Sequence, residues 1–271
     1  MNTILEYLTE MYDQGREYST INGHRSAISL YHPLIDGIQV GKHPTTRQLL
    51  KAISNKRPPQ PRLAAVWDVQ QVIKYIKAMP ENTSLTTRQL AMKATILTAL
   101  TCIPRASELH KLDTKYLEIK EDHLTFQIEG RVKHSRVGKK NPPLVLYRFQ
   151  IDRHLCPVNT ILFYLQATKE WRNSENTKVF LSNSQPHSQV CTATISSWIK
   201  EILSAAGIDM SMFTPHSTRS AASSHTKQKG LNRENILQMG NWRQKSTWEK
   251  FYHRQTQTEK KTQEFQTKVL S

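Results

Sequence analysis

Two apolar segments, His123-Leu-Thr-Phe-Gln-Ile128 and Leu144-Val-Leu-Tyr-Arg-Phe149, stand out in a chain that is otherwise patterned as helices. Their residues alternate between apolar and polar or run apolar, as they do in strands. The stretch 132–143 between them is basic and contains glycine and proline, which is typical of a long hairpin connection. The pair therefore predicts a small antiparallel sheet within a mainly helical, α+β fold.

Helical spacing surrounds this predicted hairpin on both sides. Before it, helix signals cover 67–79, and Thr86-x-x-Gln89 forms a capping box ahead of an apolar run that reaches Leu100. After it, the chain returns to a helical pattern. The helices expected there cover 157–171, 192–206, 216–229, 233–239 and 247–255.

The N-terminal part of the chain is predicted to be a separate helical domain. Apolar residues recur at helical spacing from Ile4 to Met11, a start signal follows at Ser19-Thr20, and another helix is expected from Pro44-Thr45. The segment Lys56-Arg-Pro-Pro-Gln-Pro-Arg62 then interrupts the pattern, because proline holds φ near −65° and donates no backbone hydrogen bond. We therefore predict a helical domain over 1–57, a linker over 58–65 and a mixed α/β domain over 66–271. The alternative is a long loop within one domain.

The charge of the chain points to a polyanionic partner. Lysine and arginine total 38 against 22 aspartate and glutamate, which gives a net charge of +16. The stretch 42–62 contains no acidic residue, and Asp152 is the only acid in 131–153. Each run alone is typical of a solvated face, but two runs, one in each half of the chain, suit a protein that grips a phosphate backbone from two sides.

Several other classes of protein are disfavoured. No apolar run approaches the ~20 residues that a membrane span requires, and the N-terminus has no pattern of a signal peptide. Cys102, Cys156 and Cys191 lie far apart, with no C-x-x-C pair. This set argues for a reducing compartment and against a disulfide framework or a zinc site.

Reactive residue types gather in a few short segments of the second domain: Cys102-Ile-Pro-Arg105-Ala-Ser-Glu108-Leu109, Lys133-His-Ser-Arg136, Thr214-Pro-His216-Ser-Thr-Arg219, Gly240-Asn-Trp242 and Phe251-Tyr252-His-Arg254. Taken singly, each has an ordinary explanation. Arg105 can pair with Glu108 one helical turn away, His216 and Arg219 can be a surface pair, and Tyr252 can fill a core.

Together, these residues form the set that metal-free phosphoryl transfer requires. Two arginines can bind the non-bridging oxygens of a phosphate and neutralise the charge that develops in the transition state. A lysine or histidine must protonate the leaving oxygen. A tyrosine can attack phosphorus, provided that nearby cations help its phenol, with a free pKa of about 10, to lose a proton.

In order and type, these segments resemble the catalytic set of the tyrosine recombinase (phage integrase) family. The resemblance rests on Arg105-x-x-Glu108-Leu109, Lys133, His216-x-x-Arg219, and Trp242 followed by Tyr252, and it covers the second domain nearly end to end. Ser19-Thr-Ile-Asn-x-x-Arg25-Ser-Ala-Ile28 is similar to the family's helical core-binding domain. Further details are most similar to the DIRS and Crypton recombinases of eukaryotic mobile elements: Lys133-His-Ser-Arg-Val-Gly, Leu155-Cys-Pro-Val158 and Phe251-Tyr252-x-Arg254.

The resemblance implies a site-specific recombinase that cuts and rejoins DNA through a 3′-phosphotyrosine on Tyr252. It implies that Arg105 and Arg219 hold the non-bridging oxygens. Lys133 is the expected general acid, with Lys139 or Lys140 in its place if the register of the hairpin differs.

Further roles follow from the same resemblance. His216 would assist proton transfer or bind phosphate, Trp242 would pack and donate its indole N–H to the phosphate, and Glu108 would orient Arg105 or His216. No nucleotide cofactor is expected, because one ester is exchanged for another. No metal is expected either, since the sequence has no cluster of cysteine and histidine and no paired-carboxylate site.

The partners implied are double-stranded DNA and further copies of the chain, as a tetramer on two duplexes. The segment Glu264-Phe-Gln-Thr-Lys-Val-Leu270 is either a tail that docks on a neighbouring subunit or a frayed end. The eukaryotic resemblance implies action in the nucleus. The residues expected to contact DNA are Arg25, Lys42, Arg47, Lys51, Arg57, Arg131, Arg136, Lys139 and Lys140.

The chain also departs from the family's pattern. Ser220 stands where a second histidine often follows the motif arginine, and Gly240-Asn241-Trp242 stands where many members have Gly-His. These departures keep open a DNA-binding protein of the same fold that no longer cuts. The sequence also leaves open a type IB topoisomerase-like enzyme, which shares this chemistry. A basic helical module for RNA or membranes stays open as well, and it would not require Arg105 and Tyr252 to converge.

Overall fold

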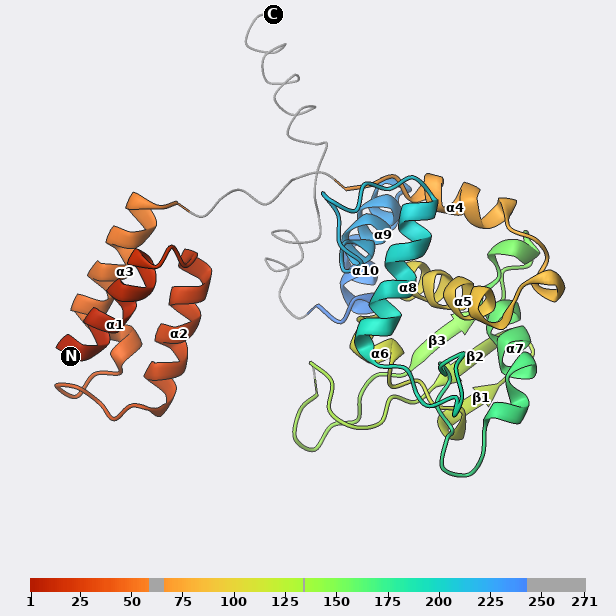
Figure 1. Cartoon of the computed structure of the whole chain (residues 1–271), viewed down its shortest axis with the longest axis horizontal. Helices are drawn as coiled ribbons and strands as arrows, with labels where there is room; N and C mark the ends of the chain where they lie inside the picture. The colour runs from red at the N-terminus through yellow and green to blue at the C-terminus, as the bar shows by residue number, and fades with distance from the viewer. Residues whose placement is uncertain (59–65, 134, 243–271) are drawn as a thin grey trace, which may run out of the picture. The chain divides into compact units, whose positions relative to one another are not determined.

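The structure is a computed structural model and describes residues 1–58, 66–133 and 135–242. The chain divides into two compact units, Met1–Leu63 and Ala64–Ser271, and the division falls within the segment predicted to be a linker. Figure 1 shows the helices and strands of the two units. Each unit has an apolar core of its own. No helix in the described ranges is long and apolar enough to cross a lipid bilayer.

The N-terminal unit contains the helices α1 (Asn2–Asp13), α2 (Tyr18–Tyr31) and α3 (Pro44–Lys56). The helix α3 begins where the sequence predicts, because Pro44 occupies its first turn and the side chain of His43 accepts a hydrogen bond from the backbone of Thr45. The apolar faces of these helices meet in one cluster, which contains Leu8, Met11, Ile21, Leu50 and Ile53. The apolar spacing of the sequence thus becomes the core of a small helical domain.

The second unit is organised around α5 (Thr87–Thr101), which begins at the predicted capping box of Thr86 and Gln89. Every position from Leu90 to Ala99 is buried. A helix buried on all sides must be covered on all sides, and α7 (Pro157–Ala167), α8 (Thr192–Ala205) and α9 (Ser217–Gln228) pack against it.

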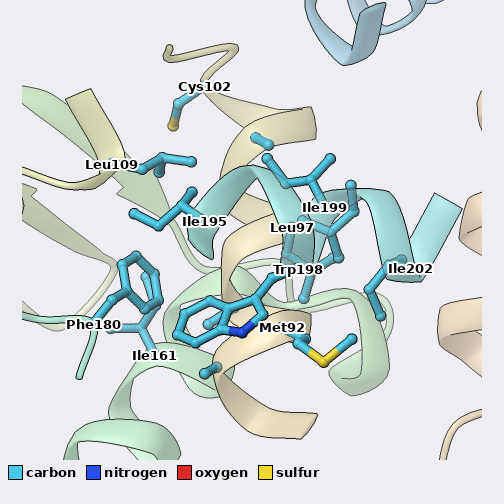
Figure 2. Close-up of a cluster of buried hydrophobic side chains, with 14 of the residues drawn as sticks. Met92, Leu97, Cys102, Leu109, Ile161, Phe180, Ile195, Trp198, Ile199 and Ile202 are labelled. Carbon is cyan, nitrogen blue, oxygen red and sulfur yellow. The ribbon is translucent and has the colours of Figure 1, made fainter. Parts of the chain in front are cut away.

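Figure 2 shows a part of this packing, where α8 lies across α5. Trp198 of α8 lies near Met92 and Leu97 of α5, and its ring meets Phe180 edge to face at 6.1 Å between centroids. Aromatic side chains bury the largest apolar areas, so this contact anchors the helix against the centre of the unit. The remaining helices of the described part are α4 (Val69–Ala78), α6 (Ala106–Leu109) and α10 (Arg233–Met239).

A three-stranded antiparallel sheet lies beside the helices, in the order β1 (Leu117–Ile119), β2 (His123–Phe126), β3 (Leu144–Tyr147). Leu124 pairs with Leu146 and Phe126 with Leu144, so these apolar side chains share one face and are buried in the core. The unit is therefore mainly helical with a small antiparallel sheet, which confirms the predicted fold class.

Some element boundaries differ from the prediction. The strand β1 was not predicted, and β2 and β3 end two residues earlier than the apolar segments suggest. The helix predicted over 157–171 ends at Ala167, and a short 3-10 turn follows it at Lys169–Trp171. The guanidinium of Arg172, after this turn, donates to the carbonyl of Thr168. The helix predicted over 247–255 lies outside the described residues.

Candidate active site

Arg105 is fixed by a break between two helices. The helix α5 ends at Thr101, Ile103 adopts a left-handed backbone with φ of 44°, and Pro104 precedes Arg105 at the N-cap of α6. The carboxylate of Glu108 accepts hydrogen bonds from the backbone N–H of Arg105 at 2.7 Å and from its guanidinium at 3.1 Å. Both side chains are largely buried, so Glu108 orients the guanidinium through a charge-assisted contact.

Arg219 lies one turn into α9 and is almost completely buried, with 3% of its surface exposed. Its guanidinium donates to the backbone carbonyls of Ile103 and Gly240, the second at 2.8 Å. It also stacks over the ring of Trp242, with 4.9 Å between the guanidinium carbon and the ring centroid. Three segments that are far apart in sequence therefore meet at this arginine.

Trp242 lies beneath Arg219 in a small apolar cluster of its own, together with Ile103, Ala222 and Ile236. Its ring packs directly onto Gly240, where a Cβ would overlap with the six-membered ring. Asn241, between them, has φ of 50° and turns the chain back so that the indole can reach this position. Trp242 thus supports the buried guanidinium from one side.

His216 forms the N-cap of α9, so the helix begins one residue later than predicted. The next residue, Ser217, accepts a hydrogen bond from the indole N–H of Trp67 at 2.8 Å and donates to the carbonyl of Thr214 at 2.6 Å. This pair joins the start of the described part of the second unit to the segment that contains the histidine. His216 itself reaches the surface.

The pKa of His216 is affected by other charged residues of the predicted set. Desolvation of the imidazole lowers the pKa of His216 below its ordinary value of 6.5. The positive charges of Arg219, Arg105 and Lys133 lower this pKa further. Four basic side chains from three separate regions of the sequence therefore lie close enough to act on one another.

Lys133 is exposed in the long connection between β2 and β3. Lys139 and Lys140, which could take its role, are exposed in the same connection, Lys139 at the end of the turn at 136–139 and Lys140 directly after it. Of these three lysines, Lys133 is the one whose charge acts on His216.

Comparison with known proteins by sequence places this geometry in a family. The model of the phage integrase family matches residues 67–258, which is most of the chain and nearly all of the second unit. The chain belongs to the phage integrase family, the tyrosine recombinases. A comparison with curated proteins by sequence finds no match.

Solved structures of tyrosine recombinases share the fold of this family member. The XerH site-specific recombinase, in a post-cleavage complex with its difH substrate, has a TM-score of 0.64 at 15% identity over 96% of this chain and 70% of its own. The Tn1549 transposon integrase, in complex with circular intermediate DNA, has a TM-score of 0.59 at 13% identity, over 96% of this chain and 83% of its own. XerA recombinase has a TM-score of 0.52 at 17% identity, over 95% of this chain and 89% of its own. At these identities the likeness establishes the fold.

The predicted nucleophile, Tyr252, lies outside the described residues, as do Ser246–Arg254 and the predicted tail segment at 264–270. Trp242 is the last residue before them that the structure describes. The geometry of this recombinase therefore covers Arg105, Lys133, His216 and Arg219, together with the supporting Glu108 and Trp242.

Some of the predicted DNA-contacting side chains form hydrogen bonds within their unit, and the others are exposed. In the N-terminal unit, Arg25 donates to the side chain of Asn22, and Arg57 donates to two carbonyls of the α1 region and stacks on Tyr12 at 4.2 Å. The contact of Arg25 is local to α2, whereas Arg57 joins the end of α3 to the α1 region. The other predicted contacts are exposed, namely Lys42, Arg47, Lys51, Arg131, Arg136, Lys139 and Lys140.

Sequence reasoning missed two residues that shape this site. Ile103 supplies a carbonyl to Arg219, and a β-branched residue with positive φ has no signal in a sequence. Trp67 supports Ser217 from a distance of 150 residues along the chain. Its position directly after the predicted linker was visible, but its partner was not.

Replacing Gly240 by alanine is expected to destabilise the second unit by about 1–3 kcal/mol, because the added methyl group and the ring of Trp242 cannot share one position. Chemical denaturation would measure the change. Gly23→Ala, within α2 of the N-terminal unit, is a control for an added methyl group without a neighbour, because its backbone is helical and no atom lies within 4 Å of its added Cβ. Unchanged stability of Gly240→Ala would show that Trp242 is not held against this glycine.

Acidification is expected to destabilise the protein through His216. The pKa of His216 is lower in the folded state than in the unfolded chain, where it has its ordinary value of 6.5. Between these two pKa values the unfolded state binds more protons, so stability falls as the pH falls below the unfolded value and levels off below the folded value. Denaturation series at several pH values should show a weaker dependence in His216→Gln. An equally steep dependence in the variant would contradict the lowered pKa.

Proposed function

We propose that this protein is an active site-specific recombinase that cuts and rejoins double-stranded DNA through a covalent 3′-phosphotyrosine intermediate. The observation that carries the proposal is that Arg105, Lys133 and the pair His216 and Arg219, from three separate regions of the sequence, lie close enough for their charges to act on His216. A generic basic module gives no reason for these groups to meet around one histidine. Metal-free phosphoryl transfer requires such a set.

The phosphate is held by Arg105 and Arg219. Glu108 fixes the first guanidinium, and the carbonyls of Ile103 and Gly240 fix the second, so both are positioned before DNA binds. Preformed positive groups stabilise the charge that builds on the non-bridging oxygens without reorganising during the reaction.

The chemical step exchanges one phosphate ester for another. The phenolic oxygen of Tyr252 bonds to phosphorus, and its proton passes to His216, which is neutral at physiological pH because its pKa is lowered. The bond from phosphorus to the 5′ oxygen breaks, and Lys133 protonates the departing oxygen. Attack of a 5′-hydroxyl on the phosphotyrosine reverses these steps, so neither a nucleotide cofactor nor a metal ion is consumed or needed.

The assembly and origin of the protein belong to the same proposal. The enzyme acts as a homotetramer on two duplexes, with the exposed basic residues of both units against the DNA. The resemblance of the motifs around Lys133 and Tyr252 to recombinases of eukaryotic mobile elements supports an origin in such an element and action in the nucleus. Sizing of the protein with and without bound duplex would test the tetramer directly.

A suicide-substrate assay tests the chemistry. Protein in EDTA would be incubated with nicked duplexes drawn from the flanks of its native locus, and a denaturing gel would be read for a covalent adduct. Trypsin cleaves after Lys250 and Arg254, so the proposal expects the DNA on the peptide Phe251-Tyr252-His253-Arg254. This peptide contains a single tyrosine, so mass spectrometry would identify the attachment without ambiguity.

Each of the remaining outcomes would favour a different function. Specific DNA binding without an adduct would favour a binding protein that no longer cuts. Relaxation of supercoiled plasmid by the monomer, without a preferred site, would favour a topoisomerase. An adduct on any other peptide would overturn the assignment of Tyr252.

A further inference from the structure

We infer that Asn141, acting with Ser135, is a positioning residue that holds the backbone of Lys133 at the site. This inference rests on the proposed role of Lys133 as general acid and deepens it. It also assigns that role to Lys133 rather than to Lys139 or Lys140.

The β ladder does not extend to Lys133. The last pair of β2 with β3 is Phe126 with Leu144, and the connection of residues 127–143 runs beyond it. Within the described residues of this connection, the backbone N–H of Gln127, directly after β2, donates to the carbonyl of Tyr116. The other backbone hydrogen bonds there close two local turns, one from Ser135 to Val132 and one from Lys139 to Arg136. Something other than the sheet must therefore hold the base of the loop.

The side-chain amide of Asn141 supplies this link. Its nitrogen donates to the backbone carbonyls of Ile128 and Gly130, each at 2.8 Å, on the opposite arm of the connection. Its oxygen accepts a hydrogen bond from the hydroxyl of Ser135 at 2.7 Å. One half-buried side chain thus ties both arms together.

Ser135 carries the link to the residue beside Lys133. Its hydroxyl also accepts a hydrogen bond from the backbone N–H of Val132 at 2.7 Å, and its own N–H donates to the carbonyl of Val132 at 3.0 Å. Lys133 occupies the corner of the turn that these two contacts close. Its backbone is therefore fixed on both sides, while its exposed side chain remains able to reach a phosphate.

The hydrogen bonds of Asn141 and Ser135 form a clamp at the base of the loop. Lys139 and Lys140 lie on the other side of this clamp from Lys133. The turn of Arg136 and Lys139 contains Gly138 with φ of 73° and the completely exposed Val137. Among the hydrogen bonds of the described residues, none joins the side chains of this turn to the rest of the unit. The clamp thus divides the loop into a held part with Lys133 and a free tip.

A general acid gains its effect from position, and a displacement of about 1 Å can cost about 10²-fold in rate. The positive charge of Lys133 acts on His216, as expected for an ammonium group held near the site. Loss of the clamp leaves the lysine present but no longer in place. The defect should then be specific to protonation of the leaving group.

The test compares two substrates in single-turnover cleavage by the full chain. Both are nicked duplexes that form the adduct with the unaltered protein, one with the natural 5′ oxygen at the scissile phosphate and one with sulfur there. A sulfur leaving group needs no general acid, because a thiol has a pKa of about 8.5, far below that of an alcohol. Lys133→Ala sets the reference, with an expected loss of about 10²- to 10⁴-fold on oxygen and recovery on sulfur.

The variants are Asn141→Ala, Ser135→Ala and the conservative Ser135→Thr. Asn141→Ala is expected to lose about 10- to 100-fold on the oxygen substrate and to recover on sulfur. Ser135→Ala should show the same pattern, and Ser135→Thr, which keeps the hydroxyl, should cleave both substrates. Asn176→Ala is the matched control, because its amide also bridges two backbone carbonyls, those of Trp171 and His187, in another loop.

Equal losses of Asn141→Ala and Ser135→Ala on both substrates, with Lys133→Ala rescued by sulfur, would overturn the positioning role and leave the proposed chemistry intact. A loss in Lys139→Ala or Lys140→Ala that sulfur rescues, with none in Lys133→Ala, would overturn the assignment of the lysine. Absence of an adduct from the unaltered protein on either substrate would overturn the proposed function itself. Thermal unfolding of each variant separates these results from a failure to fold.

Discussion

Tyr252→Phe is expected to abolish the covalent adduct with a suicide substrate while leaving the affinity for DNA unchanged. In the proposed mechanism the phenolic oxygen bonds to phosphorus, and phenylalanine keeps the ring but removes this atom. The same mechanism gives the arginines, lysine and histidine of the site roles in charge stabilisation and proton transfer, so none of them would form the covalent bond. The measurement is a denaturing gel for cleavage with a parallel binding titration at fixed salt.

The matched control is Tyr147→Phe. Tyr147 lies on β3 in the same unit, and its side chain is 64% exposed, so loss of its hydroxyl should change neither folding nor cleavage. An adduct that persists in Tyr252→Phe and disappears in Tyr147→Phe would reverse the assignment. Loss of DNA binding in Tyr252→Phe would show that the phenol contributes to recognition rather than to chemistry alone.

Arg219→Lys is expected to lower the cleavage rate by about 10³-fold even though the positive charge is kept. The guanidinium donates to two carbonyls, those of Ile103 and Gly240, while it stacks on Trp242. An ammonium group has no planar fork, so it cannot keep this arrangement and bind a phosphate oxygen as well. Leaving a buried carbonyl without a donor should also cost about 1–3 kcal/mol of stability.

Arg172→Lys provides the control for the structural part of this effect. Arg172 is also a partly buried guanidinium that donates to backbone carbonyls, those of Thr168, Lys178 and Val179, and it lies over the ring of Tyr164. Its replacement should lower stability without lowering the cleavage rate of the folded protein. If both variants lose stability and neither loses rate, Arg219 is a structural residue and not a phosphate ligand.

Much of the fold was predictable because its signals are local. The capping box of Thr86 and the proline at the start of α3 define helix starts within a few residues of sequence, and α10 has the predicted bounds. The two apolar segments predicted β2 and β3. By contrast β1 has three residues, two of them exposed, and it exists because it pairs with β2, which no local pattern reveals.

The chemical types of the site were predictable, but its supports were not. Spacing and residue type pointed to Arg105, Lys133, His216 and Arg219, and the positive charges of the other three lower the pKa of His216. Their catalytic roles stay a prediction. The contacts that hold them use backbone carbonyls and distant partners, such as Asn141 across its loop. Backbone groups are the same in every residue, so a sequence contains no mark of which carbonyl will accept a hydrogen bond.

Arg219 donates to backbone carbonyls, and this affects which substitutions around it can accumulate in evolution. Every amino acid supplies the same carbonyl, so the acceptor at position 103 is inherited with the path of the chain and not with a residue type. At position 240 it is the ring of Trp242, not the carbonyl, that demands glycine. Selection can therefore preserve the orientation of the arginine while the sequence around its acceptors changes.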